Sequence, residues 1–230
     1  MTVLQVVQRA ATRCGLDIPS SLTGTDRTLV EIVEVVNEAA RTLRDEYDWQ
    51  ALKRQAALTG DGTSEAFDLP SDYARMSKNA HIWPANTPNW PLDHVTDEDD
   101  WLRLNAQNYT YINGRWMVFG GQINIKPAPA NAVVLNFFYI SNGVFMNGTS
   151  RISAVDDDNN TFVLDENLLK LAFVWQWKMK AGQSYEAELD QYEEALAVAV
   201  GSDKGPRATA IGLSRYPYNA RTAYPGSIVP

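Results

Sequence analysis

An apolar stripe over residues 165–201 constrains this chain of 230 residues more than any other feature of its sequence. Apolar and aromatic residues recur along it at alternating steps of three and four, which is the spacing of one helix face. The residues of this stripe are Leu171, Trp175, Gly182, Tyr185, Leu189, Tyr192, Leu196 and Ala199. Asp165 can cap the N-terminus of such a helix, and Gly201 can end it. The pattern therefore predicts one long helix over residues 165–201.

The first half of this predicted helix is apolar on almost every side, so other elements of the fold must cover it. The residues that we expect to hold the core together are Trp175, Trp177, Gly182, Tyr185, Leu189 and Tyr192. The second half carries acids on its other faces, namely Glu186, Glu188, Asp190, Glu193 and Glu194. We therefore expect the second half to lie at a surface.

Two amphipathic segments near the N-terminus supply partners for this helix. A capping box at Thr2 opens the first of them, which ends at Gly15. A second capping box, at Thr28, opens a longer helix that reaches about residue 48. We expect residues 1–50 and 165–203 to form a helical bundle.

Residues 51–164 change to a period of two, which is the spacing of β-strands. Turn residues predict hairpins in this region around residues 60–62, 113–114, 120–121 and 156–160. The segment 132–140 is apolar on both faces, so we expect a central strand that is covered on both sides. Thr96 is expected to cap a short helix. The sequence thus predicts an α+β fold in which an antiparallel β-rich insertion interrupts a helical bundle.

Charge is distributed unequally along the chain. The net charge of −8 divides into +4 on residues 204–230 and −12 on residues 1–203. Prolines and glycines interrupt residues 204–230 and exclude a long helix, so we expect an extended C-terminal tail. The acidic body argues against a protein that grips nucleic acid, because that function needs clustered Lys and Arg.

The sequence predicts no catalytic residue, no metal site and no cofactor. His81 and His94 lie near a proline-rich loop without a second histidine at ligand spacing, so a surface role is favoured. Residues 97–100 are acidic, but acids at a helix N-terminus are explained by the helix dipole. Residues 156–160 lack the glycine and the terminal glutamate of a calcium loop. Cys14 lies on an apolar helix face, where thiols are usually inert.

Two other classes of function stay open at this point. The seven Trp residues are compatible with a β module that binds carbohydrate or a receptor, although core packing explains most of their positions. An acidic pair such as Asp97 and Asp100 is compatible with a hydrolase. The first alternative predicts binding to glycans, and the second predicts a concave pocket around a carboxylate with a raised pKa.

Three segments carry a family resemblance. They are TVLQVVQRAA at residues 2–11 with Gly15 and Leu16, DLPSDYARM at residues 68–76, and Trp175-Gln176-Trp177-Lys178 followed by Gly182, Tyr185 and Tyr192-Glu193. In this arrangement the chain resembles the head-to-tail adaptor proteins of tailed bacteriophages, also called connector or head-completion proteins. The resemblance extends in order from residue 2 to residue 205.

This resemblance implies a structural virion protein without enzymatic activity. It implies a dodecameric ring that binds beneath the portal protein, extends the DNA channel and provides a platform for a downstream tail or nozzle protein. Double-stranded DNA would pass through without specific binding. The protein would lie in the neck between capsid and tail after assembly in the host cytoplasm, and no apolar run of the sequence is long enough to span a membrane.

The resemblance also implies a role for the C-terminal tail, because such tails anchor to the portal. The tail contains residue types that carry binding energy at interfaces, and no acid interrupts them. The residues expected to bind the portal are Arg207, Arg215, Tyr216, Pro217, Tyr218, Arg221, Tyr224 and Pro225.

Overall fold

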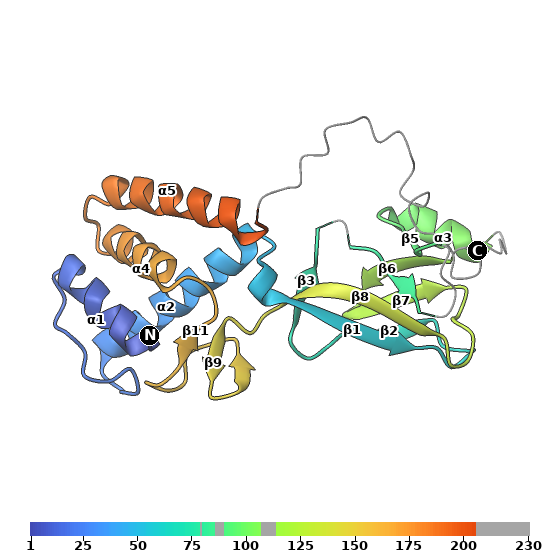
Figure 1. Ribbon diagram of the computed structural model, residues 1–230, viewed down its shortest axis with the longest axis horizontal. Coiled ribbons are helices and arrows are strands. Elements are labelled where there is room, and N and C mark those ends of the chain that lie inside the picture. Colours follow the sequence, from blue (N-terminus) through green and yellow to red (C-terminus); the bar gives the residue numbers. More distant parts are fainter. Residues whose placement is uncertain (79, 86–89, 107–113, 206–230) are drawn as a thin grey trace, which may run out of the picture.

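The computed structural model describes residues 1–78, 80–85, 90–106 and 114–205, and it shows two lobes joined end to end (Figure 1). The helical lobe contains α1, α2, α4, α5 and a small sheet. The β lobe contains two larger sheets and α3, and it lies within residues 53–141. The predicted α+β class is confirmed. The residues predicted to bind the portal all lie within 206–230, outside the described residues.

The helix α4 (Glu166–Lys180) lies at the centre of the helical lobe. It contacts α1 (Val3–Cys14), α2 (Arg27–Glu46) and α5 (Glu186–Asp203). Its buried residues lie on all sides of the helix, as the apolar sequence predicts. The two ends of the chain therefore share one core, and the prediction that the N-terminal and C-terminal helices pack together is confirmed.

The predicted single helix over residues 165–201 is wrong, because the chain turns back between α4 and α5. Gly182 has a φ of 67°, in the left-handed region that only glycine adopts without cost. The N–H of Gly182 bonds the carbonyl of Met179 at 3.1 Å, and the N–H of Gln183 bonds that of Lys178 at 2.9 Å. This pair of bonds is the Schellman motif that ends helices. The predicted end at Gly201 is also wrong, since α5 reaches Asp203.

Most of the other predicted helix ends are correct. Thr2 forms the expected capping box, Gly15 ends α1, and Asp165 caps α4. The cap of α2 is Asp26 and not Thr28, because the Asp26 side chain accepts the N–H of Thr28 at 3.2 Å. A carboxylate is an equally good N-cap, and Asp26 stands two residues closer to the preceding loop.

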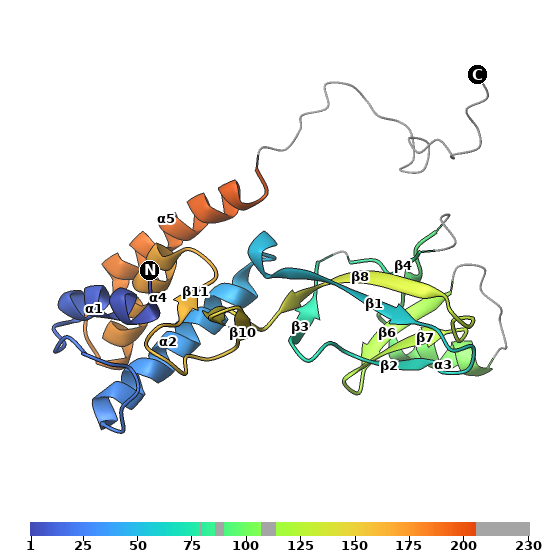
Figure 2. The ribbon, with the colours of Figure 1, turned by 60° about the horizontal axis from the view of Figure 1, so that its bottom comes forward.

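The β lobe is a sandwich of two sheets (Figure 2). In the first sheet the central strand β8 (Val134–Ser141) pairs with β1 (Lys53–Thr59) on one side and with β3 (Tyr73–Met76) and β4 (Trp83–Pro84) on the other. The strands of the second sheet, in spatial order, are β2 (Ala66–Asp68), β7 (Gln122–Lys126), β6 (Arg115–Phe119) and β5 (Asp93–His94). Large side chains fill the space between the sheets, including Trp116, Ile123, Ile125, Leu135 and Phe137.

Only one of the two outer sheet faces is covered within the described part of the lobe. The helix α3 (Glu98–Ala106) packs through Trp101 against Met117 and Phe119 on the second sheet. The outer face of the first sheet has no such cover, and Phe138 on it is 52% exposed. The strand predicted at 132–140 is central, as expected, but the expectation that both its faces are covered is wrong.

Strand pairing differs from the hairpin predictions in two places. The strands on either side of Gly60 enter different sheets, because β1 pairs with β8 and β2 pairs with β7. The predicted hairpin around residues 156–160 is also absent, since β10 (Ser150–Ile152) and β11 (Thr161–Phe162) both pair with β9 (Phe145–Asn147). The hairpin at residues 120–121 is confirmed by β6 and β7. The turn predicted at residues 113–114 follows a segment, 109–112, outside the described residues.

The small sheet β10-β9-β11 belongs to the helical lobe. Phe145 and Phe162 lie in the same core as α1, α2 and α4. A bridge between Thr2 and Thr161, and a 2.7 Å hydrogen bond from the N–H of Val3 to the carbonyl of Asn160, attach this sheet to the start of α1.

A charged cluster joins the two lobes where α2 ends. Arg75 of β3 donates to the Asp48 carboxylate and to the backbone carbonyls of Arg44 at 3.5 Å and Tyr47 at 3.1 Å. A guanidinium at this place satisfies carbonyls that the helix itself leaves without partners. The other carboxylate oxygen of Asp48 accepts the N–H of Lys78 at 2.5 Å. We name these residues the junction cluster.

Candidate interaction surfaces

The acidic residues considered for a hydrolase stabilise a helix. The Asp97 carboxylate accepts the N–H groups of Asp99 at 2.8 Å and Asp100 at 3.1 Å, so Asp97 and not the predicted Thr96 caps α3. Asp100 in turn accepts a hydrogen bond from Arg103 at 2.6 Å. These contacts assign both carboxylates to local structure, and the structure offers the hydrolase alternative no support.

The histidines and the acidic loop also have structural explanations. The His94 ring stacks on Trp116 with 4.1 Å between ring centroids, and burial and the neighbouring His81 lower the His94 pKa. In the acidic loop, Asp158 accepts the N–H of Leu22 at 2.5 Å, and the Asn160 side chain accepts the N–H of Asp157 at 3.0 Å. Within the described residues no cluster of His, Cys, Asp and Glu is placed to hold a metal ion.

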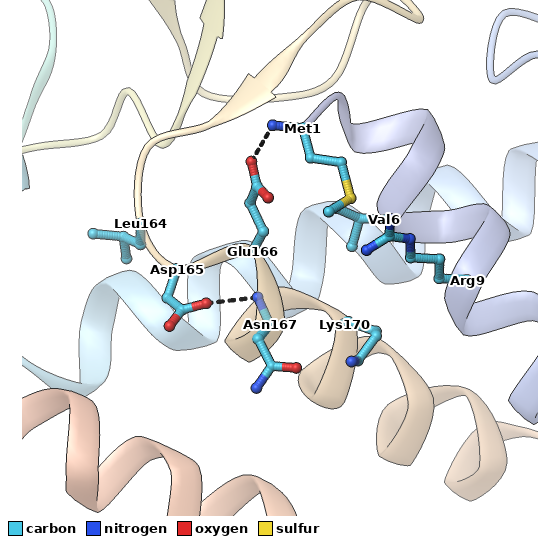
Figure 3. Close-up of a pocket in the computed structure, with 8 residues that line it drawn as sticks. All are labelled: Met1, Val6, Arg9, Leu164, Asp165, Glu166, Asn167 and Lys170. Carbon is cyan, nitrogen blue, oxygen red and sulfur yellow. Dashed lines mark hydrogen bonds and ion pairs between the residues drawn. The ribbon is translucent and has the colours of Figure 1, made fainter.

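A cavity of about 380 Å³ lies between the start of α1 and the start of α4 (Figure 3). The N-terminal ammonium of Met1 pairs with the Glu166 carboxylate. Asp165 accepts the N–H of Asn167 at 2.7 Å and so caps α4. Both carboxylates are therefore occupied by groups of the protein itself, and we assign this cavity no ligand.

The residues predicted to hold the core together divide into two groups in the structure. Trp177 and Tyr192 are buried, and Trp175 and Leu189 are partly buried against the same core. Trp175 and Tyr192 join α4 to α5, with 6.0 Å between their ring centroids. Gly182 is exposed, and Tyr185 lies just ahead of α5, so both belong to the turn between these helices.

Most tryptophans serve packing, which leaves the carbohydrate-binding alternative with little support. Trp49, Trp101, Trp116 and Trp177 are all less than 10% exposed. An uncovered pair remains on the outer face of the first sheet, where Trp83 is 38% exposed and Phe138 is 52% exposed.

Sequence reasoning placed Phe138 on a covered face and so missed this surface. The register aligns Trp83 with Asn136, so that Trp83, Asn136 and Phe138 share the outer face. Asn136 was the available signal, because a polar residue between Val134 and Phe138 interrupts the apolar pattern of a covered face. We name Trp83, Asn136 and Phe138 the open sheet face.

The helix α5 presents a strongly acidic surface. Residues 181–203 contain six acids and no Lys or Arg. One of the acids, Glu188, pairs with Lys178 of α4, and this hydrogen bond lowers the Glu188 pKa. The other acids of α5 form the acidic surface that was predicted for the second half of the stripe.

A comparison with known families adds to this geometry. A family model described as SU10 adaptor protein matches residues 1–213. The chain belongs to the SU10 adaptor protein family. The match covers both lobes, and it confirms the resemblance to phage head-to-tail adaptors that the sequence motifs carry. No match was found among curated proteins.

Membership of the SU10 adaptor family identifies a structural protein of a phage particle. Such an adaptor is a component of the virion neck and associates with portal and tail components. The described helices include none with the length and apolarity needed to cross a membrane.

Proposed function

We propose that this SU10 adaptor forms a dodecameric ring beneath the portal, extends the DNA channel and provides the platform to which a downstream tail or nozzle protein attaches. The observation that carries this proposal is the family match over residues 1–213. Native mass spectrometry of the protein mixed with its portal tests it. We expect a complex with twelve adaptor copies, and an adaptor that stays monomeric beside the portal would contradict the proposal.

Each region has a part in this proposal. The helical bundle of residues 1–50 and 165–203 forms the body of the ring, because its acidic and apolar surfaces offer broad lateral contacts. The β lobe, residues 53–141 of the β-rich insertion 51–164, projects from that body and contacts the next component through the open sheet face. Assembly takes place in the host cytoplasm, before the neck is complete.

The channel surface of the ring is acidic in this proposal, so that DNA passes without being held. Residues 1–203 carry a net charge of −12, which repels phosphate. We expect no measurable binding of the protein to duplex DNA at physiological salt in a fluorescence anisotropy titration. Submicromolar binding, or a ring whose lumen is lined by Lys and Arg, would contradict the acidic channel.

The C-terminal tail anchors the adaptor to the portal in this proposal. Its Arg and Tyr residues, which include Arg215, Tyr218 and Arg221, are types that dominate interface energies. Deletion of residues 206–230 is expected to weaken co-sedimentation with the portal by about tenfold or more, since the loss of even one good anchor has that effect.

Two matched variants sharpen this test. Arg215→Glu with Arg221→Glu should weaken portal binding, whereas Arg41→Glu changes an exposed arginine on α2 and should not. Circular dichroism checks that each variant keeps its fold. A truncated protein that joins the portal as tightly as the full chain would show that the tail is no anchor.

A further inference from the structure

The last turns of α5 carry an uncharged run that its own lobe covers only in part. Residues 195–202 read ALAVAVGS, and none of them is fully buried. Val198 is 69% exposed, and Tyr192 is the one buried residue of the helix. A helix segment that is apolar on all sides is normally covered by other elements. The exposed run therefore indicates a surface that something else occupies.

A groove of about 640 Å³ runs beside this segment. Its apolar walls come from three parts of the helical lobe, and they include Trp49 after α2, Leu164 and Leu168 around the start of α4, and Val198 and Ala199 on α5. Acids stand along the groove at Asp165, Glu194 and Asp203. Among the described residues that line it there is no Lys or Arg. The groove thus suits a segment that is both apolar and cationic.

We propose that residues 206–213 of the same chain fold back into this groove. The segment reads PRATAIGL, so it supplies the cation Arg207 and the apolar residues Ile211 and Leu213. An extended chain places Ile211 and Leu213 on one face, where both can meet the apolar wall. Residues 204–230 contain no acid that the groove would repel.

The end of α5 lies at the edge of the groove. Gly205 has a φ of 65° and donates its N–H to the carbonyl of Ser202 at 3.0 Å, which allows the chain to reverse. Ser202 and Asp203 already line the groove, so the segment starts at its edge. From Gln191 to Asp203 the groove follows about 18 Å of helix, which about six extended residues can cover. Residues 206–213 are long enough for this path.

This proposal goes beyond portal anchoring and does not depend on it. Residues 214–230 remain available for the portal, whereas Arg207, one of the residues predicted to bind the portal, is assigned here to the groove. The groove contact is present in the free protein. Its role would be to fix the direction in which the remaining tail leaves the lobe.

Disulfide trapping in the full-length protein tests the proposal. A chain with Val198→Cys and Ile211→Cys is oxidised mildly, and cross-links within one chain are separated from those between chains on non-reducing gels. The native Cys14 does not interfere, because it is buried and burial raises its thiol pKa to about 11. The matched control carries Ala197→Cys with Ile211→Cys, since Ala197 is also exposed on α5 but does not line the groove.

We expect the Val198 pair to cross-link within the chain at least about tenfold faster than the Ala197 pair, because disulfides need their Cα atoms within about 7 Å. Adding Glu194→Lys should slow the Val198 pair by removing an acid from the groove. Equal rates for the two pairs, or cross-links that form only between chains, would overturn the proposal. If Val198→Cys does not fold, Ala199→Cys offers a second position on the same wall.

Discussion

Replacing Phe173 by alanine is expected to lower the free energy of unfolding of the helical lobe by about 3–5 kcal/mol, as truncation of large buried aromatics does. Phe173 is 1% exposed in the middle of α4, and its ring stacks with that of Trp177 at 5.8 Å. Because α4 contacts α1, α2 and α5, the cavity would open where these helices meet. Urea unfolding followed by far-ultraviolet circular dichroism measures the effect.

Phe138→Ala is the matched control for this variant. It removes the same side chain from the open sheet face, where Phe138 is 52% exposed. We expect it to change the unfolding free energy by less than about 1 kcal/mol, as surface substitutions generally do. Equal losses for the two variants would show that α4 is not the centre of the core.

Replacing Arg75 by alanine is expected to cost about 2–3 kcal/mol by breaking the junction cluster. The Asp48 carboxylate is only 10% exposed, so it would lose its charged partner in a poorly solvated place. Two carbonyls near the end of α2 would lose the same donor. The control is Arg103→Ala, which breaks an exposed pair on α3 and should cost less than about 1 kcal/mol.

The junction cluster also makes the stability of the protein depend on pH. Burial alone would raise the Asp48 pKa, but hydrogen bonds from Arg75 and from the N–H of Lys78, with the nearby positive charges, lower it below 3.8. Stability from a lowered pKa is fully present above 3.8 and is lost as the pH falls through the folded-state pKa. We therefore expect Arg75→Ala to lose less stability than the native protein when the pH is lowered below 4. Parallel acid curves for the two proteins would exclude Asp48 as the titrating group.

The helical core was largely predictable from sequence. The one large error was the single helix predicted over residues 165–201, and it shows that periodicity does not reveal a turn between two helices. The spacing of three and four passes through the turn at Gly182 without a break, although Gly182 itself is exposed. On either side of the turn, Trp175 of α4 and Tyr192 of α5 face the same core. A signal was present in Gly182 itself, which follows Lys178 and Lys180 as glycine often follows the basic last turn of a helix.

Strand pairing was less predictable, because it depends on contacts between distant segments. Gly60 was interpreted as a hairpin residue, yet its position is set by a close approach of another loop. A Cβ at Gly60 would lie 2.5 Å from the carbonyl oxygen of Ala130. Local sequence around residue 60 does not contain that information. The open sheet face, in contrast, was missed although Asn136 interrupts the apolar pattern of its strand. The junction cluster was not predicted, since Asp48 and Arg75 lie 27 residues apart in the sequence and belong to different lobes.

The pairing of Lys53 with Ile140 has a consequence for how this protein can diverge. The chain leaves the helical lobe through β1 and returns to it through the neighbouring strand β8. For the helical lobe, the residues between these two strands are therefore equivalent to one closed loop. Lengthening a closed loop costs little, because closure entropy grows only with the logarithm of its length. Relatives can therefore lengthen, shorten or exchange this projection while the helical core stays unchanged.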